Sequence, residues 1–299
     1  MNKNLKAHLA ALAANLIYGA NYSISKSVMP EYIKPTGFIA IRVVVSLLLF
    51  VLFHLLFGKN EKVERKDYLQ FFLCGLFGVA INQILFFEGL SRTTAISAAL
   101  IITTNPVLVL IAASYYLKET ITGRKITGIL LGVVGAAILI MNENAGGGIK
   151  GSWVGDALIF VNAASYAWFL VIVKPLIKKY NAVLVITWTF FFGMLLVVPF
   201  GYHQASEVAW STFTGKTWLA VGYICIISTF LAYLLNTYSL KELSPAVVSF
   251  YIYIQPIFAT LISLVLTGED VTMVQGVSCL LIFGGVYLVS ERTLAGAKS

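Results

Sequence analysis

Two segments decide the fold of this chain: "TTNPVLVL", residues 103–110, and "YIQPIFAT", residues 253–260. They lie 150 positions apart, and the sequence around them aligns at that shift without a gap over residues 81–139. The match places Pro106 on Pro256, each within an apolar stretch. Because proline position and apolar pattern agree together, we expect the chain to contain two copies of one unit.

A second match, at a shift of 148, relates the start of the chain to its middle. "IYGANYSISK" falls on "SYAWFLVIVK", which aligns Tyr18 with Tyr166. The glycine-rich stretch "NAGGGIKGS" lies where the two units would join. We therefore expect a first repeat over residues 1–145 and a second over residues 146–299.

The composition predicts that most of the surface faces lipid. Of 299 residues 59% are hydrophobic and 11% are charged, and the mean hydropathy is +0.87. A soluble domain carries about 25% charged residues, and a helix needs about 20 apolar residues to span a bilayer core. The apolar runs are continuous, so we predict an all-α integral membrane protein with ten transmembrane helices. The expected helices cover residues 7–29, 35–57, 68–90, 95–117, 124–142, 154–175, 182–201, 216–239, 245–267 and 272–290.

The positive charges predict how the helices are oriented. With a cytoplasmic N-terminus, fifteen Lys and Arg residues fall in inner segments and four in outer ones, leaving Lys26 and Arg42 inside helices, for a total of 21. Cytoplasmic loops are rich in such residues, so both termini are expected inside. Five helices per repeat is an odd number, which makes the second repeat inverted. Inverted repeats are typical of secondary transporters, although a duplicated membrane protein with another role is the alternative.

The same charges and the cysteines disfavour several classes of partner. The net charge of +8 is spread over short loops, which is typical of membrane topology and not of a nucleic-acid groove. Cys74, Cys225 and Cys279 lie far apart in apolar runs and indicate neither a disulfide framework nor a metal site. We expect no cofactor and no nucleic acid. The expected partners are a lipid bilayer and a small molecule, with a monomer as the working state.

Long stretches of the sequence resemble EamA-type transporters of the drug/metabolite transporter superfamily. Tyr-Gly-Ala-Asn at residues 18–21, followed by Arg42 at the start of the second helix, fits the first helix pair of that family. "FFEGLSRTTAISAALIITTNPVLVL" and "NTYSLKELSPAVVSFYIYIQPIFAT" resemble corresponding parts of its two repeats. The resemblance covers nearly the whole chain and is weakest over residues 198–215. It implies ten helices, alternating access around a central cavity, and export of amino acids, metabolites or drugs across a bacterial inner membrane, without fixing the substrate.

One face of the first helix is polar along its length. Asn15, Tyr18, Tyr22 and Lys26 are spaced at i, i+3, i+7 and i+11, which places them on one side of a helix. In hydrocarbon such a face points at the bundle interior or a water-filled cavity. We expect these residues to line the substrate path. Polar contacts between helices, at about 1 kcal/mol each, are the alternative, and Lys26 could instead extend to the outer surface.

Charged residues near the expected outer end of the helices predict a gate. Arg42 lies several residues into the second helix, where an unpaired cation costs about 2.5–3.5 kcal/mol and requires a partner. Glu88, near the outer end of the third helix, is the anion that the topology brings to this level. We expect Glu88 to pair with Lys26 or Arg42. Substrate or proton binding by Glu88, or simple exposure at the mouth, are the alternatives.

Two prolines and a second polar helix complete the expected site. Pro106 and Pro256 each remove a helix hydrogen bond, which predicts a kink and leaves a carbonyl free. Matching breaks of this kind lie at the binding region of transporters, whereas a packing kink without ligand contact is the alternative. The further residues expected to contact substrate are Asn105, Asn162, Tyr166, Trp168, Tyr253 and Gln255.

The sequence favours a carrier over an enzyme. HExxH, GxSxG and P-loop motifs are absent, and the expected helices hold no paired aspartates, so neither hydrolysis nor ATP-driven transport is expected. A channel or a structural protein is the remaining alternative. A cavity with aromatic, amide and charged groups favours an amino acid as cargo. A drug-like organic cation is second, and a sugar phosphate or other anion third.

Overall fold

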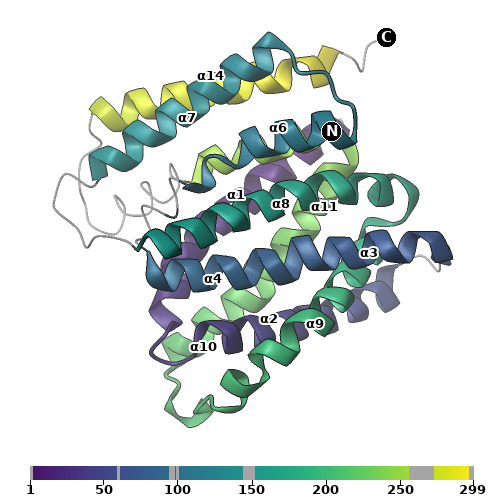
Figure 1. Ribbon diagram of the computed structural model, residues 1–299, viewed down its shortest axis with the longest axis vertical. Helices are drawn as coiled ribbons and strands as arrows, with labels where there is room; N and C mark the ends of the chain where they lie inside the picture. The colour runs from purple at the N-terminus through teal and green to yellow at the C-terminus, as the bar shows by residue number, and fades with distance from the viewer. Residues whose placement is uncertain are drawn as a thin grey trace.

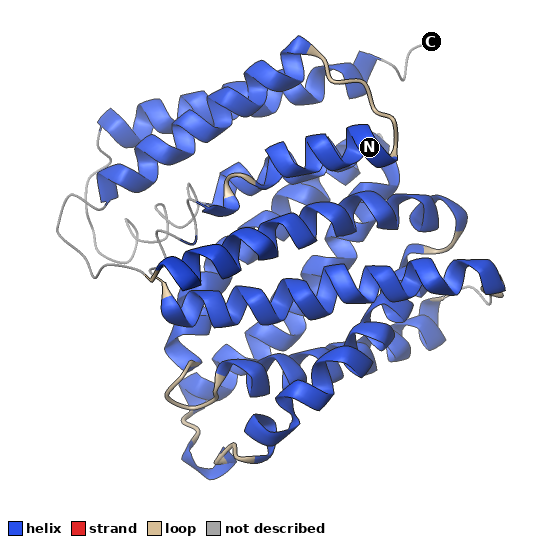
Figure 2. Ribbon diagram, in the orientation of Figure 1, coloured by secondary structure: helices blue, strands red, loops and turns tan. Residues whose placement is uncertain are grey.

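Helices joined by short connections build the described part of the protein. The computed structural model describes residues 3–58, 61–93, 98, 101–143, 152–255 and 273–295, and no strand occurs within them (Figures 1 and 2). The elements are α1 (Lys3–Val28), α2 (Pro35–Phe57), η1 (Arg65–Asp67), α3 (Tyr68–Gly75), η2 (Leu76–Ile81), α4 (Asn82–Arg92), α6 (Asn105–Tyr116), α7 (Gly123–Glu143), α8 (Trp153–Lys179), α9 (Ala182–Ser206), η3 (Trp210–Thr212), α10 (Gly215–Gly222), η4 (Tyr223–Leu231), α11 (Ala232–Glu242), α12 (Pro245–Phe250), η5 (Tyr251–Tyr253) and α14 (Met273–Ala295).

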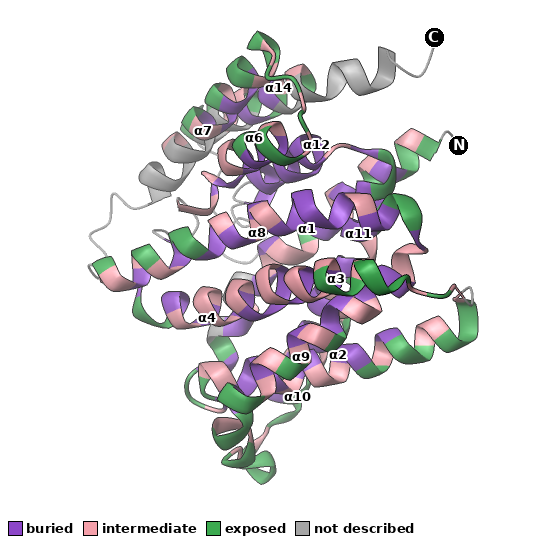
Figure 3. Cartoon of the chain, turned by 45° about the vertical axis from the view of Figure 1, so that its right-hand side comes forward, coloured by how far each residue is buried: buried purple, intermediate pink, exposed green. Residues whose placement is uncertain are grey.

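Five helical segments of the described chain are long and apolar enough to cross a membrane. They are Pro35–Phe57, Arg65–Arg92, Trp153–Lys179, Ala182–Ser206 and Gly215–Glu242. Large apolar side chains such as Leu55 and Leu219 remain 76% and 77% exposed, and exposed residues follow the outer faces of the bundle (Figure 3). Lipid is the solvent that suits such faces. The protein is therefore an all-α multi-pass membrane protein, and the count of ten spans stays a prediction because parts of two expected helices lie outside the described residues.

Both halves of the chain widen into a π-helix at the equivalent place. η2 covers Leu76–Ile81, and adding 150 gives residues 226–231, which lie inside η4 (Tyr223–Leu231). The segments Arg65–Arg92 and Gly215–Glu242 each continue from an α-helix through this π-turn into a second α-helix. π-turns are rare and are often found at functional sites. The relation between the halves thus extends to irregular backbone.

The helix pairs are also repeated between the halves. α4 packs on α8 while α11 packs on α1. In each half, the helix that follows the π-turn therefore packs on the first helix of the other half. α7 lies beside α14 along one edge of the bundle (Figures 1 and 3). The start of α1 and the end of α14 lie at the same end of the bundle in both views. Which side of the membrane this end faces remains a prediction.

Small residues allow the paired helices to approach closely. A Cβ on Gly201 of α9 would lie 2.4 Å from the carbonyl oxygen of Thr36, and one on Gly285 of α14 would lie 2.5 Å from that of Gly128. Close backbone contact of this kind is typical of membrane helices, whose association depends on packing. At the first contact the Gln204 side chain also accepts from the amides of Thr36 and Gly37 at 3.1 and 3.2 Å. These bonds satisfy free N–H groups at the start of α2.

A charged cluster ties the connection after α2 to the end of α8. Lys179 Nζ lies 2.6 Å from Asp67 Oδ2 and 2.7 Å from Glu64 Oε1, and the Tyr180 hydroxyl donates to Asp67 at 2.6 Å. The Lys179 ammonium holds the pKa of the Glu64 carboxyl below its ordinary value, with help from Lys66. Glu64 and Lys179 are exposed while Tyr180 is buried, so the ion pairs themselves contribute little to stability and the cluster mainly holds the connection in place.

Candidate functional site

A cavity between the two halves of the chain is the candidate site. Its empty volume is about 720 Å³, including its opening to solvent. Both halves form its wall, because α1, α2, α4 and α6 contribute from the first and α8, η4, α11 and η5 from the second. The described lining residues are Asn15, Tyr18, Asn21, Arg42, Asn82, Gln83, Phe86, Phe87, Ile102, Asn105, Asn162, Ala163, Tyr166, Ser228, Tyr233, Ile252 and Gln255.

Six of the residues expected to contact substrate meet in this cavity. They come from α1, α6, α8 and the helical residues directly after η5, and they are Asn15, Tyr18, Asn105, Asn162, Tyr166 and Gln255. Their shared position is an observation, whereas substrate contact stays a prediction. The side chains of Tyr22 and Lys26, and the whole of Pro256, lie outside the described residues.

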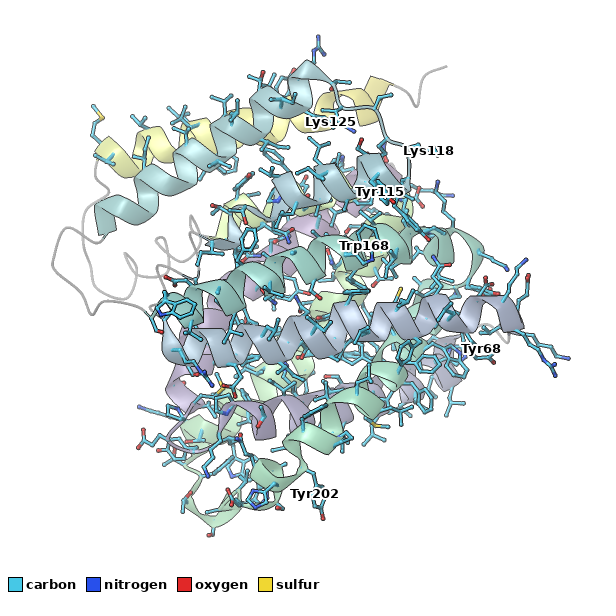
Figure 4. The ribbon with its side chains drawn as sticks, viewed as in Figure 1. Tyr68, Tyr115, Lys118, Lys125, Trp168 and Tyr202 are labelled. Atoms are coloured by element: carbon cyan, nitrogen blue, oxygen red, sulfur yellow. The ribbon has the colours of Figure 1, made fainter. Side chains whose placement is uncertain are left out.

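The structure places two other expected contact residues away from the cavity. Trp168 lies 6.5 Å from Tyr115 and 5.9 Å from Tyr116, ring centre to ring centre, between α8 and α6 (Figure 4). Trp168 follows Tyr166 by two residues, which is about 200° around a helix, so the two rings face different sides. Tyr253 is 0% exposed and packs on Phe250 with ring centres 4.9 Å apart. Both belong to the packed core.

One helix ends before Pro106 and a new helix begins, instead of one continuous helix with a kink at the proline. Residues 101 and 102 are helical, residues 103 and 104 form a turn, and α6 begins at Asn105. Pro106 therefore stands in the first turn of a new helix, where its missing N–H costs nothing. The expectation of one continuous helix over residues 95–117 is wrong at this point.

Two side-chain amides, each just before one of the two prolines, bond to the first helix of the other half. Asn105 Nδ2 donates to the carbonyl of Ala163 at 2.8 Å, and Gln255 Nε2 donates to Asn15 Oδ1 at 2.7 Å. Asn105 and Gln255 are 150 positions apart, and Asn15 and Ala163 are 148 apart. Each half therefore holds the first helix of the other through the residue just before its proline.

One pair of equivalent residues meets directly at the cavity. Gln83 Nε2 donates to the Tyr233 hydroxyl at 3.2 Å, and that hydroxyl donates to the carbonyl of Gly78 at 3.2 Å. Gln83 and Tyr233 are also 150 positions apart, so the cavity lies where the two repeats face each other. Sequence reasoning missed both residues, because an amide and a phenol carry no visible likeness. Their matching register after the two π-turns is the signal that could have found them.

Arg42 lies in the cavity wall and does not pair with Glu88. Its side chain is 4% exposed, its Nε donates to Thr229 Oγ1 at 3.0 Å, and its guanidinium carbon lies 4.9 Å from the centre of the Phe87 ring. Glu88 pairs with Arg92 on its own helix at 2.9 Å. The expected pairing of Arg42 with Glu88 is wrong, because one residue along a helix is a turn of about 100° and it is Phe87 that faces Arg42.

A second buried cation, Lys174, was counted among the loop charges. It lies within α8, it is 7% exposed, and its ammonium donates to the carbonyls of Leu240, Leu243 and Lys241, the last two at 2.6 and 3.4 Å. These carbonyls stand at the C-terminal end of α11, where free carbonyls and the helix dipole attract a cation. Lys174 therefore caps a helix and is no evidence for loop orientation.

Three polar atoms of the cavity wall have no hydrogen-bond partner within the described residues. They are Gln83 Oε1, Asn105 Oδ1 and Ser228 Oγ. Buried polar groups are nearly always paired, so these three buried atoms mark where the wall is incompletely satisfied. Among the described lining residues Arg42 is the one that carries a charge. The site thus offers one cation, unpaired acceptors and aromatic rings.

Comparison with known proteins gives consistent results. A model described as the EamA-like transporter family matches residues 5–141 and again residues 153–291. Uncharacterized transporter YyaM of Bacillus subtilis is 23% identical over 291 residues, covering 96% of this chain and 94% of that protein. Protein WALLS ARE THIN 1 of Arabidopsis thaliana is 22% identical over 322 residues, covering 96% and 83%. A crystal structure with 18% identity superposes with a TM-score of 0.76 over 98% of this chain and 99% of that one, a likeness in fold alone.

Proposed function

The chain belongs to the EamA-like transporter family, and on that premise we propose that it exports small metabolites as a secondary transporter, with amino acids as the first substrate class. The proposed mechanism is alternating access around the cavity, between a first repeat over residues 1–145 and an inverted second repeat over residues 146–299. The observation that carries the proposal is a cavity with walls from both halves. Transporters with repeats bind their substrates at such junctions.

The hydrogen bonds at the broken segments support this mechanism. Asn105 donates to the backbone carbonyl of Ala163 and Gln255 donates to the side chain of Asn15, so each half reaches the first helix of the other from a related position. If the halves rock against each other, one contact opens as the site turns to one side and the other opens as it turns to the opposite side. The sequence holds no P-loop, so a solute or ion gradient drives the proposed cycle.

The cavity wall supports amphiphilic cargo. The wall combines amide and tyrosine side chains with Phe86, Phe87, Ile102 and Ile252, which suits a solute with a polar end and an apolar end. The drug-like organic cation is disfavoured, because the charge at the described wall is that of Arg42 and no carboxylate lines it. Amino acids remain the first choice.

Counterflow in liposomes tests the proposed function. Purified protein is reconstituted in vesicles loaded with unlabelled amino acid, and uptake of the labelled amino acid is followed. A carrier gives a saturable, transient overshoot that empty vesicles lack. Linear, unsaturable flux would indicate a channel, and absence of flux for amino acids, organic cations and anions alike would contradict transport.

A further inference from the structure

The strongest unexplained feature of the cavity is a fixed cation that meets no anion among the residues that the structure describes. Nε of Arg42 donates to Thr229 Oγ1 at 3.0 Å, and the Thr229 hydroxyl in turn donates to the carbonyl of Ile224 at 2.7 Å. The Thr229 hydroxyl therefore uses its proton for Ile224 and accepts from Arg42, which holds the Nε side of the guanidinium in place. The Phe87 ring covers one face at 4.9 Å. The two terminal nitrogens remain for another partner.

The described part of the chain supplies no counter-ion there. No carboxylate of the described chain lies within ion-pair distance of Arg42, and Glu88 is engaged with Arg92. A buried charge is ordinarily paired or hydrogen-bonded. A guanidinium with two free N–H₂ groups matches a carboxylate through two parallel hydrogen bonds. A ligand carboxylate would therefore complete what the fold leaves open.

The opposite groups of the wall fit the rest of such a ligand. Asn105 Nδ2 is used by Ala163 and Gln83 Nε2 by Tyr233, so the unpaired atoms of both amides are their oxygens. Both oxygens are buried hydrogen-bond acceptors, and a ligand ammonium that reached them would satisfy them. Phe86 and Phe87 offer rings to an apolar side chain.

We propose that Arg42 determines the specificity of this transporter by binding the carboxylate of its substrate, which makes an amino acid with an apolar side chain the class of cargo. The proposal rests on the proposed function and names the residue that selects the substrate. It requires ligands without a carboxylate to bind poorly, even when they keep the ammonium group and the side chain.

A matched ligand series tests the carboxylate on the unmodified protein. The thermal unfolding midpoint of the full chain in detergent is measured with L-phenylalanine, L-phenylalaninamide, 3-phenylpropionate and glycerol 3-phosphate. We expect L-phenylalanine to raise the midpoint most, 3-phenylpropionate less, and the amide not at all, because a ligand that binds the folded state stabilises it. Equal stabilisation by the amide, or stabilisation by the phosphate ester alone, would overturn the assignment.

Variants then test the residue. Arg42→Gln should weaken phenylalanine binding at least tenfold while the midpoint without ligand stays equal or rises, since an unpaired buried cation is removed. Arg42→Lys should keep part of the affinity. Lys34→Gln is the matched control, because Lys34 stands at the start of the same helix in an exposed pair with Glu207. This variant should bind phenylalanine as tightly as the unmodified protein. Unchanged affinity in Arg42→Gln contradicts the proposal. Counterflow that persists in Arg42→Gln overturns this inference and leaves the transporter function intact.

Discussion

Arg42 and Lys174 are both cations buried within apolar helices, and they differ in what their donors meet. Lys174 has three N–H donors and three carbonyl partners at the end of α11. Arg42 has five donors, and within the described residues its hydrogen bond is the one to Thr229. Burial is nearly equal, at 7% and 4% exposure. Burial of a charge therefore does not distinguish a structural cation from a binding one, whereas the number of satisfied donors does.

The largest expected effect is on Lys174. Lys174→Met keeps the stem and removes the ammonium, which leaves buried carbonyls without a donor at the end of α11 and should cost about 3 kcal/mol of stability. The measurement is the unfolding midpoint and the yield of monodisperse protein in detergent. Lys178→Met, one turn away and exposed, should stay within about 0.5 kcal/mol. A stable Lys174→Met protein would remove the distinction between the two cations.

The next effect concerns the residue that fixes Arg42. Thr229→Val removes the acceptor at 3.0 Å and should weaken substrate binding roughly tenfold, because a hydrogen bond to a charged group is worth about 1.5–3 kcal/mol. Thr229→Ser keeps the hydroxyl and should keep the affinity. Isothermal titration with the transported amino acid measures both. Equal affinities in the two variants would show that Thr229 does not orient the guanidinium.

A smaller effect is expected at the ring over Arg42. Phe87→Leu removes a cation–π contact at 4.9 Å, worth about 0.5–1 kcal/mol, so the dissociation constant should rise about two- to fivefold. Phe87→Tyr keeps the ring and serves as control. If the Phe87→Leu variant binds substrate as tightly as the unmodified protein, Arg42 is held by Thr229 without help from the ring.

The smallest effect is expected at Glu88, the partner that the sequence predicted for Arg42. Glu88→Gln breaks an exposed i,i+4 pair with Arg92, and such pairs contribute about 0.3–0.5 kcal/mol. Stability and transport should both stay close to those of the unmodified protein in midpoint and uptake assays. Loss of uptake in this variant would restore a role for Glu88 at the gate.

Helix positions were predictable where the sequence holds local signals. α2 covers Pro35–Phe57, the same range as expected, because Pro35 and Gly58 mark its ends. α9 runs to Ser206, five residues beyond the expected 201, through a polar stretch that looks like a loop. Gln204 in that stretch accepts from the first amides of α2. A contact with a distant helix decided this end, and sequence periodicity does not contain it.

The site was predictable in part for the same reason. The polar face of the first helix identified Asn15 and Tyr18, and the proline registers identified Asn105 and Gln255, all of which line the cavity. Tyr233 was missed, because its repeat partner is the amide Gln83 and the two side chains share no visible likeness. Its place at the cavity follows from the packing of its helix against the first repeat.

Local properties of the sequence determined the membrane environment, the two related halves and the proline registers, because hydropathy and spacing act along one helix at a time. Only the tertiary structure decided which buried cation is free. "TTNPVLVL" and "YIQPIFAT" predict that two helices are interrupted. They do not show that the partners of Asn105 and Gln255 lie on helices of the other half. Likewise, a cation is satisfied or unsatisfied according to carbonyls and hydroxyls that reach it from distant segments. How many donors of a buried cation find acceptors depends on the assembled bundle. The proposed role of Arg42 rests on that number.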